Sequence, residues 1–131
     1  MLELGGSDAF IILEDVDVEF AARKAVESRL RNSGQACTNG KRFIIHEKVY
    51  EAVKDKMAEI LKNEYKVGPP TDDSVRIGPL ARDDLLENLK QQVSKAVEHG
   101  ARVTYGDESQ LKTKTSEGNY FSPIFIEDLK P

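Results

Sequence analysis

The single cysteine of this chain, Cys37, is the residue best suited to covalent chemistry. It stands in the segment Asn32–Thr38, on a loop expected between the end of a helix and the following strand. A lone cysteine cannot form an internal disulfide or a thiolate metal cluster, so it is either a small buried hydrophobe or a reactive thiol. Loops commonly present reactive groups, and the nearby cations Lys41 and Arg42 would favour loss of the thiol proton.

A second candidate lies at the start of the chain, where Glu3 is flanked by leucines and followed by the pair Gly5-Gly6. A carboxylate in apolar surroundings is held less strongly in its charged form, which suits a general base working near neutral pH. The alternative is an ordinary solvated side chain in front of a turn. The glycine pair lacks the fuller spacing of a phosphate-binding loop.

Glu-Leu-Gly-Gly at positions 3 to 6 and Gly-Gln-Ala-Cys at positions 34 to 37 resemble the two active-site signatures of the aldehyde dehydrogenase superfamily, in their usual order and separation. The resemblance extends along essentially the full chain, through Asp15–Asp17, Lys41–Ile45, Ile77–Leu80, Gly100–Arg102 and Tyr120–Pro123. It implies that residues 1–131 form a partial, nucleophile-bearing catalytic domain with a three-layer α/β fold and a mainly parallel sheet.

The resemblance also implies a covalent mechanism. The Cys37 thiolate would attack an aldehyde carbon to give a thiohemiacetal, whose hydride passes to NAD+ or NADP+. Glu3 would activate the water that hydrolyses the resulting thioester to a carboxylic acid, and the backbone N–H of Cys37 would stabilise the oxyanion. The other implied site residues are two beside the nicotinamide, Leu4 and Gly5, and two lining the aldehyde pocket, Ala36 and Thr38.

Other parts of the family's active site are expected outside these residues. The cofactor-binding domain and the asparagine that completes the oxyanion hole precede the Glu-Leu-Gly-Gly segment in the family, and the segment that holds the cofactor's ribose comes later. We therefore expect NAD or NADP to bind the full-length parent, and no cofactor to bind this chain alone, which should be inactive as a dehydrogenase. The parent is expected to be a homo-oligomer.

The runs Gly5–Leu13 and Lys41–Ile45 are most similar to the bacterial succinate-semialdehyde dehydrogenase branch. A carboxylate-bearing aldehyde would need a cationic partner, for which Lys41 or Arg42 is available, unless these side chains face solvent. Two other functions stay open: a non-enzymatic oligomerisation or partner-binding module, and slow ester hydrolysis at Cys37 that needs no nicotinamide.

The elements that must position these residues follow the order strand, helix, strand, helix, helix, strand, strand, which is typical of an α/β domain. The unbroken apolar run Ala9–Leu13 predicts a central strand covered on both faces. Asp15 or Asp17 then offers an N-cap for a helix from Val18 to about Asn32, which Gly34 ends.

The remaining elements alternate between apolar segments and polar breaks. They are a strand at Arg42–His46, a helix from about Glu47 to Tyr65, a loop from Gly68 to Pro79, a second amphipathic helix, a strand at Ala101–Tyr105, a polar surface loop at Gly106–Asn119 and a strand at Tyr120–Ile126. The first helix of this part should bury Val49, Val53, Met57, Ile60 and Leu61. The second should bury Leu85, Leu86, Leu89, Val93, Ala96 and Val97, with Gly100 beyond its end.

Charge and composition exclude several function classes. The 19 basic and 23 acidic residues are interspersed, with a net charge of −4 and no basic block, so nucleic acid is not an expected partner. The longest apolar runs are shorter than a membrane span, and we expect a cytoplasmic protein that does not contact membranes. The two histidines, His46 and His99, have no ligands at suitable spacing, so no metal site is expected.

Overall fold

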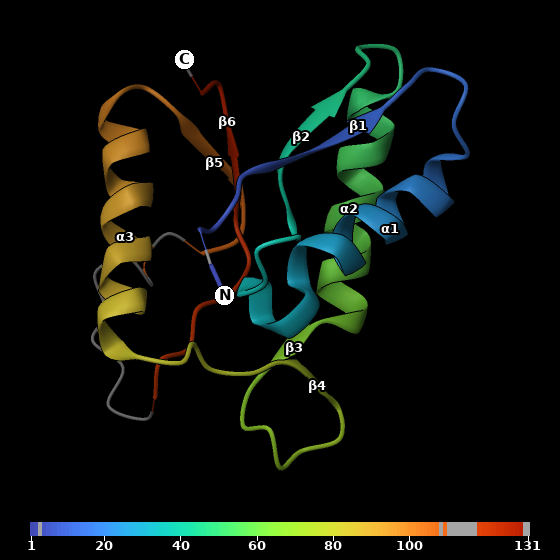
Figure 1. Cartoon of the computed structure of the whole chain (residues 1–131). Coiled ribbons are helices and arrows are strands. Elements are labelled where there is room, and N and C mark those ends of the chain that lie inside the picture. The colour runs from blue at the N-terminus through green and yellow to red at the C-terminus, as the bar shows by residue number, and fades with distance from the viewer. Residues whose placement is uncertain (3, 108, 110–117, 130–131) are drawn as a thin grey trace. The chain divides into compact units, whose positions relative to one another are not determined.

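The computed structural model describes residues 1–2, 4–107, 109 and 118–129 (Figure 1). The chain divides into two compact units, Met1–Lys66 and Val67–Pro131, each of which is described by itself. Both units combine helices with short strands, which confirms the α/β class. The sheets are two-stranded and only partly parallel.

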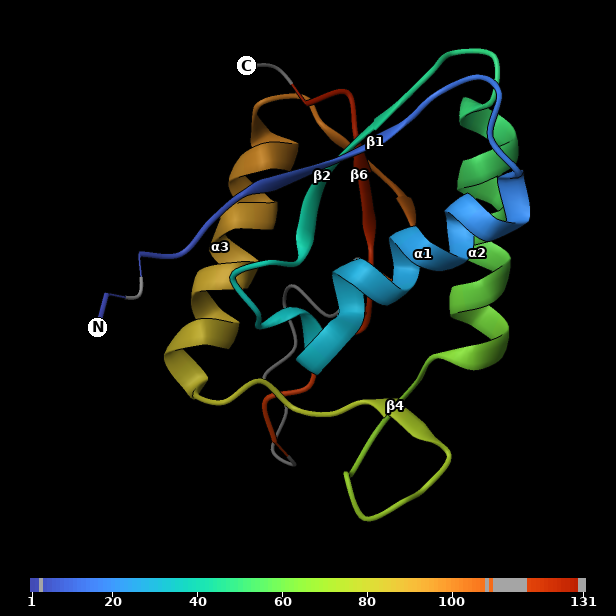
Figure 2. The same cartoon turned by 45° about the vertical axis from the view of Figure 1, so that its right-hand side comes forward.

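The first unit is a strand–helix–strand–helix run made of β1 (Asp8–Ile12), α1 (Val18–Leu30), β2 (Gly40–Ile45) and α2 (Tyr50–Glu64). β1 and β2 run side by side and pair in parallel, with Phe10 opposite Phe43 (Figures 1 and 2). α1 packs on both α2 and β2. Because parallel strands begin at the same edge of a sheet, the segments that lead into β1 and β2 lie next to each other.

Local sequence explains where α1 begins and how it packs. Asp17 is the N-cap, and its carboxylate accepts a hydrogen bond of 2.9 Å from the backbone N–H of Phe20. Small side chains on the buried face allow close approach of neighbouring elements, and the buried residues are Ala21, Ala22, Ala25 and Val26.

One face of the β1–β2 pair is open, so the prediction of a strand covered on both faces is wrong for this chain. Ile12 is only 3% exposed, whereas Ile11 and Leu13 are 63% and 62% exposed. Ile44 is opposite Ile11 in the register, shares its face and is 51% exposed. Successive side chains of a strand point to opposite faces, and only one of these two apolar faces is buried.

α2 follows the predicted helix closely. Its buried residues are Val53, Met57, Ile60 and Leu61, as expected from their spacing, whereas Val49 precedes the helix and is only half-buried. The helix begins at Tyr50 rather than Glu47 because the intervening residues form a turn, in which Val49 N–H donates to the His46 carbonyl at 3.0 Å.

The second unit contains β4 (Val75–Ile77), α3 (Asp83–Glu98), β5 (Arg102–Tyr105) and β6 (Phe125–Glu127), and β4 pairs with the short β3 (Lys66–Val67). β4 lies within the segment predicted as a loop. β5 and β6 pair antiparallel. The last strand is shorter than the predicted Tyr120–Ile126, because Pro123 has no N–H to donate to a sheet.

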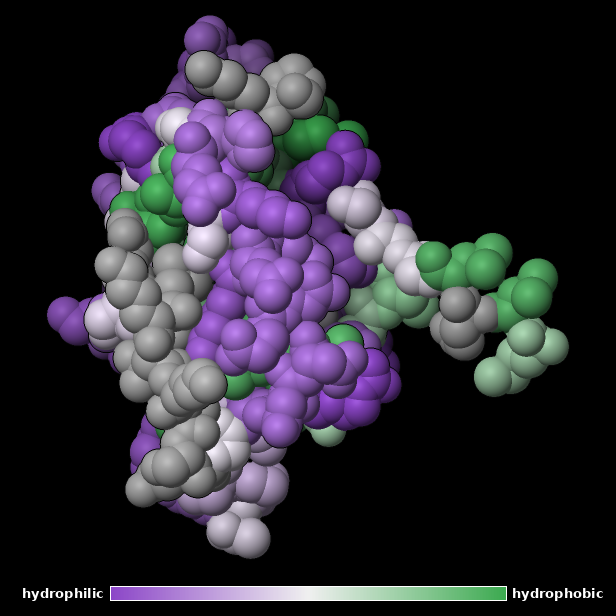
Figure 3. Space-filling view, turned by 90° about the vertical axis from the view of Figure 1, so that its left-hand side faces the viewer, coloured by the Kyte–Doolittle hydropathy of each residue, from purple (hydrophilic) through white to green (hydrophobic). Residues whose placement is uncertain are grey.

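α3 has one buried face and one hydrophilic face, and the hydrophilic face is visible in Figure 3. Leu86 and Val93 are buried as predicted, but Val97 is 37% exposed and was wrongly assigned to the core. Lys90 is 6% exposed, so its aliphatic stem takes part in the buried face. Most of the predicted polar loop at Gly106–Asn119 lies outside the described residues.

Among the described residues, no helix is long and apolar enough to cross a membrane. In the same part of the chain, no group of three or more His, Cys, Asp or Glu side chains is placed to hold a metal ion.

Candidate active site

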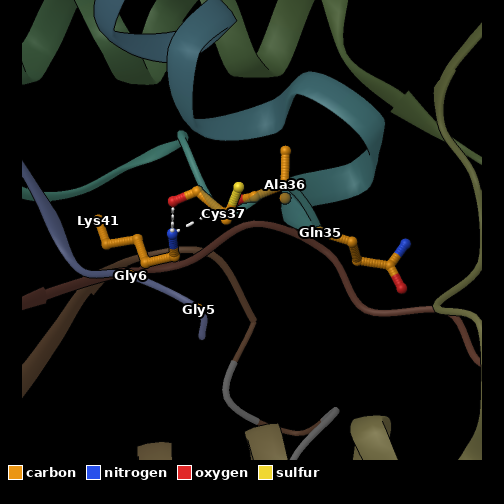
Figure 4. Close-up of a pocket in the computed structure, with 7 residues that line it drawn as sticks. Gly5, Gly6, Gln35, Ala36, Cys37 and Lys41 are labelled. Atoms are coloured by element: carbon orange, nitrogen blue, oxygen red, sulfur yellow. Dashed lines mark hydrogen bonds between the residues drawn. The ribbon is translucent and has the colours of Figure 1, made fainter. Parts of the chain in front are cut away.

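An open depression in the first unit lies where the segments leading into β1 and β2 meet (Figure 4). It is lined by Gly5, Gly6, Gly34, Gln35, Ala36, Cys37 and Lys41. Gly6 approaches the cysteine loop closely, since a Cβ at this position would lie 3.0 Å from the Cys37 carbonyl oxygen. The parallel strand pair therefore brings the two candidate segments of the sequence together.

Cys37 is an exposed free thiol, which excludes the reading of a small buried hydrophobe. It lies in the turn between the short helix η1 (Arg31–Gly34) and β2. Among the described residues, its backbone N–H makes no hydrogen bond, and the same holds for the N–H of Thr38. The thiol is therefore accessible, and the two N–H groups have no partner within the described part of the chain.

The backbone enters the cysteine loop through three successive residues with positive φ. Asn32, Ser33 and Gly34 have φ angles of 54°, 55° and 80°, and α1 ends at Leu30, two residues before the predicted end at Asn32. Non-glycine residues adopt this conformation only where the surroundings hold them. Part of that support is Arg29, whose guanidinium donates to the Gly34 carbonyl at 3.1 Å. Burial lowers the pKa of Arg29 from its ordinary value, although a guanidinium stays charged at neutral pH.

Asn39 anchors the other side of the loop. It is 1% exposed, and its amide Nδ2 donates to the carbonyls of Arg29 at 3.1 Å and Arg31 at 3.0 Å. These carbonyls belong to the last turn of α1 and the residue after it, where helical partners are missing. One buried amide thus ties the cysteine loop to the end of α1.

Lys41 fastens the same loop from within the depression. Its ammonium Nζ donates to the carbonyls of Cys37 at 2.9 Å, Ala36 at 3.3 Å and Asn39 at 3.3 Å. Figure 4 shows the ammonium beside the Cys37 carbonyl, with the thiol pointing away from it. The positive charge is therefore bound to backbone oxygens rather than to the sulfur.

The segment with Gly5 and Gly6 forms the wall of the depression opposite the cysteine loop, and this wall has few side-chain contacts. Arg42 Nε donates to the Ser7 carbonyl at 2.9 Å, which links this segment to β2. Gly5 has a φ of 73°, and no atom lies within 4 Å of the place where a Cβ would be. A flat ring such as a nicotinamide fits beside a backbone without side chains, so these residues suit the cofactor that the resemblance implies.

The structure brings some of the predicted site residues together and leaves others apart. Gly5, Ala36 and Cys37 line the same depression. Leu4 and Thr38 are exposed and are not among its lining residues. Glu3 lies outside the described residues, so its role stays a prediction.

Two residues gain roles that the sequence did not indicate. Asn39 is of a residue type common in solvated turns, so only the fold shows that it is buried. Lys41 was considered as an aid to thiol ionisation or a partner for a substrate carboxylate, whereas its contacts are with the loop backbone.

Comparison with known proteins agrees with this geometry. The model of the aldehyde dehydrogenase family matches residues 1–131. The chain is 40% identical over 131 residues to a succinate semialdehyde dehydrogenase [NAD(P)+] of Escherichia coli (strain K12), covering 100% of the chain and 27% of that protein. It is 39% identical over 129 residues to a succinate-semialdehyde dehydrogenase [NADP(+)] of Mycolicibacterium paratuberculosis, covering 98% and 26%.

A solved structure of lactaldehyde dehydrogenase from Escherichia coli superposes with a TM-score of 0.87 at 32% identity. The match covers 98% of this chain and 26% of that one. The chain thus spans about a quarter of the length of the relatives it matches.

An exposed thiol on a loop beside a glycine pair in an α/β unit is the arrangement expected of a class of enzymes that use a cysteine nucleophile. The full-length family match is decisive within that class: the chain belongs to the aldehyde dehydrogenase family. The predicted resemblance, including its similarity to succinate-semialdehyde dehydrogenases, is confirmed.

Proposed function

We propose that this chain carries the nucleophile of an NAD(P)+-dependent aldehyde dehydrogenase, and that Cys37 is that nucleophile. The observation that carries the proposal is the exposed thiol, held on a fastened loop opposite the glycine segment. The thiol would attack the aldehyde carbon, and two backbone N–H groups that have no partner within the described residues would hold its oxygen beside the open backbone of Gly5.

In the proposed reaction, the Cys37 thiolate adds to the aldehyde carbon. A C–S bond forms, and the carbonyl electron pair moves to oxygen, where the Cys37 N–H donates to the oxyanion. A thioester on Cys37 follows when this carbon has lost its hydride. Glu3 then takes a proton from water as the water oxygen bonds to the carbon, the C–S bond breaks, and a carboxylic acid and the thiolate are released.

NAD+ or NADP+, when bound, supplies the acceptor for the hydride. From this chain, Gly5 and Leu4 would lie beside the nicotinamide, because the open backbone at Gly5 leaves room for a flat ring. We propose succinate semialdehyde as the aldehyde, on the basis of the two relatives that carry that name.

Acylation of Cys37 tests the nucleophile directly. The chain is incubated with p-nitrophenyl acetate, release of p-nitrophenolate is followed, and the acetylated residue is located by mass spectrometry. We expect a burst with the acetyl group on Cys37 and no burst in Cys37→Ala, while Cys37→Ser slows the reaction strongly because a hydroxyl is far less ionised than a thiol. Acetylation elsewhere, or a burst that persists in Cys37→Ala, would contradict the proposal.

We further propose that these 131 residues by themselves do not reduce NAD+ or NADP+ with any aldehyde. Positioning of reactants supplies about 7–11 kcal/mol of a barrier, and the chain spans only about a quarter of the length of its relatives. A nucleotide-reduction assay should give a flat trace. Sustained aldehyde-dependent reduction that Cys37→Ala abolishes would refute this expectation.

The alternative is a non-enzymatic partner-binding module, which is favoured by the open apolar face at Ile11, Leu13 and Ile44. The two candidates separate by the rate of acylation, because any exposed thiol reacts slowly with an activated ester, and only a site built for the reaction should acylate Cys37 faster than the urea-unfolded chain.

A further inference from the structure

We propose that Lys41 is a positioning residue that fixes the direction of two backbone N–H groups, those of Cys37 and Thr38, and so prepares the depression to bind an oxyanion. This rests on the proposed role of Cys37 as the nucleophile. It adds a residue whose side chain works through the backbone of the loop and does not touch the reacting atoms.

The ammonium of Lys41 has as many protons as it has acceptors within reach. A lysine ammonium has three protons, and the ammonium of Lys41 has three carbonyl acceptors, on Ala36, Cys37 and Asn39. All three acceptors belong to the loop that carries the thiol. Such contacts between a charge and neutral acceptors are stronger than hydrogen bonds between neutral groups.

The geometry of the peptide bond sets the direction of the two N–H groups. The described chain has no cis peptide bond, and in a trans peptide the carbonyl of one residue and the N–H of the next point in opposite directions. Since the carbonyls of Ala36 and Cys37 point at the ammonium, the N–H groups of Cys37 and Thr38 point away from it. Figure 4 shows that the thiol also points away from the ammonium.

The contacts with Lys41 also polarise the peptide groups that carry these N–H groups. A hydrogen bond to a carbonyl oxygen polarises the whole peptide group and makes its N–H a better donor. The two peptide groups polarised by Lys41 are the ones whose N–H groups lack a partner among the described residues. An oxygen bonded to a carbon on the Cys37 sulfur would therefore meet donors that are already oriented and strengthened.

The same geometry argues against a second role for Lys41. Its ammonium has three backbone oxygens within 3.3 Å, which matches its capacity of three donors, so the carboxylate of a substrate would have to compete with these contacts. Loss of Lys41 should therefore affect charged and neutral acyl compounds by the same factor.

The test compares two reactions of the same thiol. Acylation by p-nitrophenyl acetate passes through an oxyanion, whereas alkylation by iodoacetamide is a displacement at saturated carbon and forms none. We expect Lys41→Met to slow acylation of Cys37 about tenfold or more, which is part of the value of an oxyanion donor. Alkylation should change by less than about threefold, as expected for the loss of a charge near an exposed group.

Two further variants control this comparison. Lys41→Arg keeps the charge and several donors, and should recover part of the acylation rate. Lys62→Met removes an exposed charge from α2 and should change neither rate. Circular dichroism establishes folding, and Lys41→Gln, which keeps a neutral donor, replaces Lys41→Met if the latter does not fold.

Three results would overturn the proposal. If acylation and alkylation fall by the same factor, Lys41 acts on the ionisation of the thiol and not on the N–H groups. If neither rate changes, the three contacts have no effect on reactivity. If the unchanged chain is not acylated at Cys37 at all, the proposed function fails together with this inference.

Discussion

The depression has two walls: the cysteine wall, formed by residues 34–37, and the glycine wall, formed by Gly5 and Gly6. The two walls are held in opposite ways. The cysteine wall is fastened by side chains from three directions, through Arg29, Asn39 and Lys41. The glycine wall is linked to β2 by Arg42, through the Ser7 carbonyl, and has open space beside Gly5. We infer that the cysteine wall fixes the nucleophile and that the glycine wall leaves room for a ligand.

The largest expected effect comes from removing the Asn39 side chain, which anchors the cysteine wall to the end of α1. Asn39→Ala removes two hydrogen bonds from a buried site and leaves the carbonyls of Arg29 and Arg31 without that donor. We expect a loss of about 2–4 kcal/mol in the free energy of unfolding, measured by urea denaturation.

Asn63→Ala is the matched control, because Asn63 is exposed on α2 and should change stability by less than about 0.5 kcal/mol. Equal stability losses in the two variants would mean that the Asn39 anchor is unimportant.

An intermediate effect is expected where the walls approach each other. Gly6→Ala puts a methyl group 3.0 Å from the Cys37 carbonyl oxygen, so the cysteine loop must move and acylation of Cys37 should slow several-fold. Gly5→Ala meets no neighbour but is strained by its φ of 73°, which should cost about 1 kcal/mol of stability without slowing acylation. Parallel measurement of unfolding and acylation separates the two variants, and the reverse order of their acylation rates would contradict the assignment of the walls.

The smallest effect is expected at the link between Arg42 and the glycine wall. Arg42→Met removes an exposed hydrogen bond to Ser7, which should cost less than about 1 kcal/mol in the same urea experiment. Acylation should stay close to that of the unchanged chain. A stability loss as large as that of Asn39→Ala would show that the glycine wall is the more firmly held of the two.

The sequence predicted the features that depend on local pattern. The period of the apolar residues located α2 and its buried residues. The acidic residues before the first helix limited the N-cap to Asp15 or Asp17, and the structure has Asp17. The order of the motifs pointed to the family and to the exposed thiol. These signals lie within a few residues of the elements they define.

The errors arose where the outcome depends on distant parts of the chain. An apolar run cannot tell how many of its faces will be covered, which is why Ile11 was expected in the core. The contacts of Asn39 and Lys41 join polar side chains to backbone carbonyls, and the same residue types occur in many solvated turns. Their roles become visible only when the end of α1 and the start of β2 are in place.

The buried Asn39 also has a consequence for the chemical ageing of the protein. An asparagine followed by glycine loses its amide when the glycine nitrogen attacks the side-chain carbon, which converts the residue to aspartate or its isomer. In the folded chain, Gly40 N–H is held by Ser28 Oγ at 3.1 Å while the Asn39 amide is held by two carbonyls, so neither group is free to turn toward the other. Unfolding removes this protection, and an aspartate at this position would face carbonyl oxygens that it cannot hydrogen-bond when ionised. Each episode of unfolding would therefore risk a covalent change that hinders the loop from closing again.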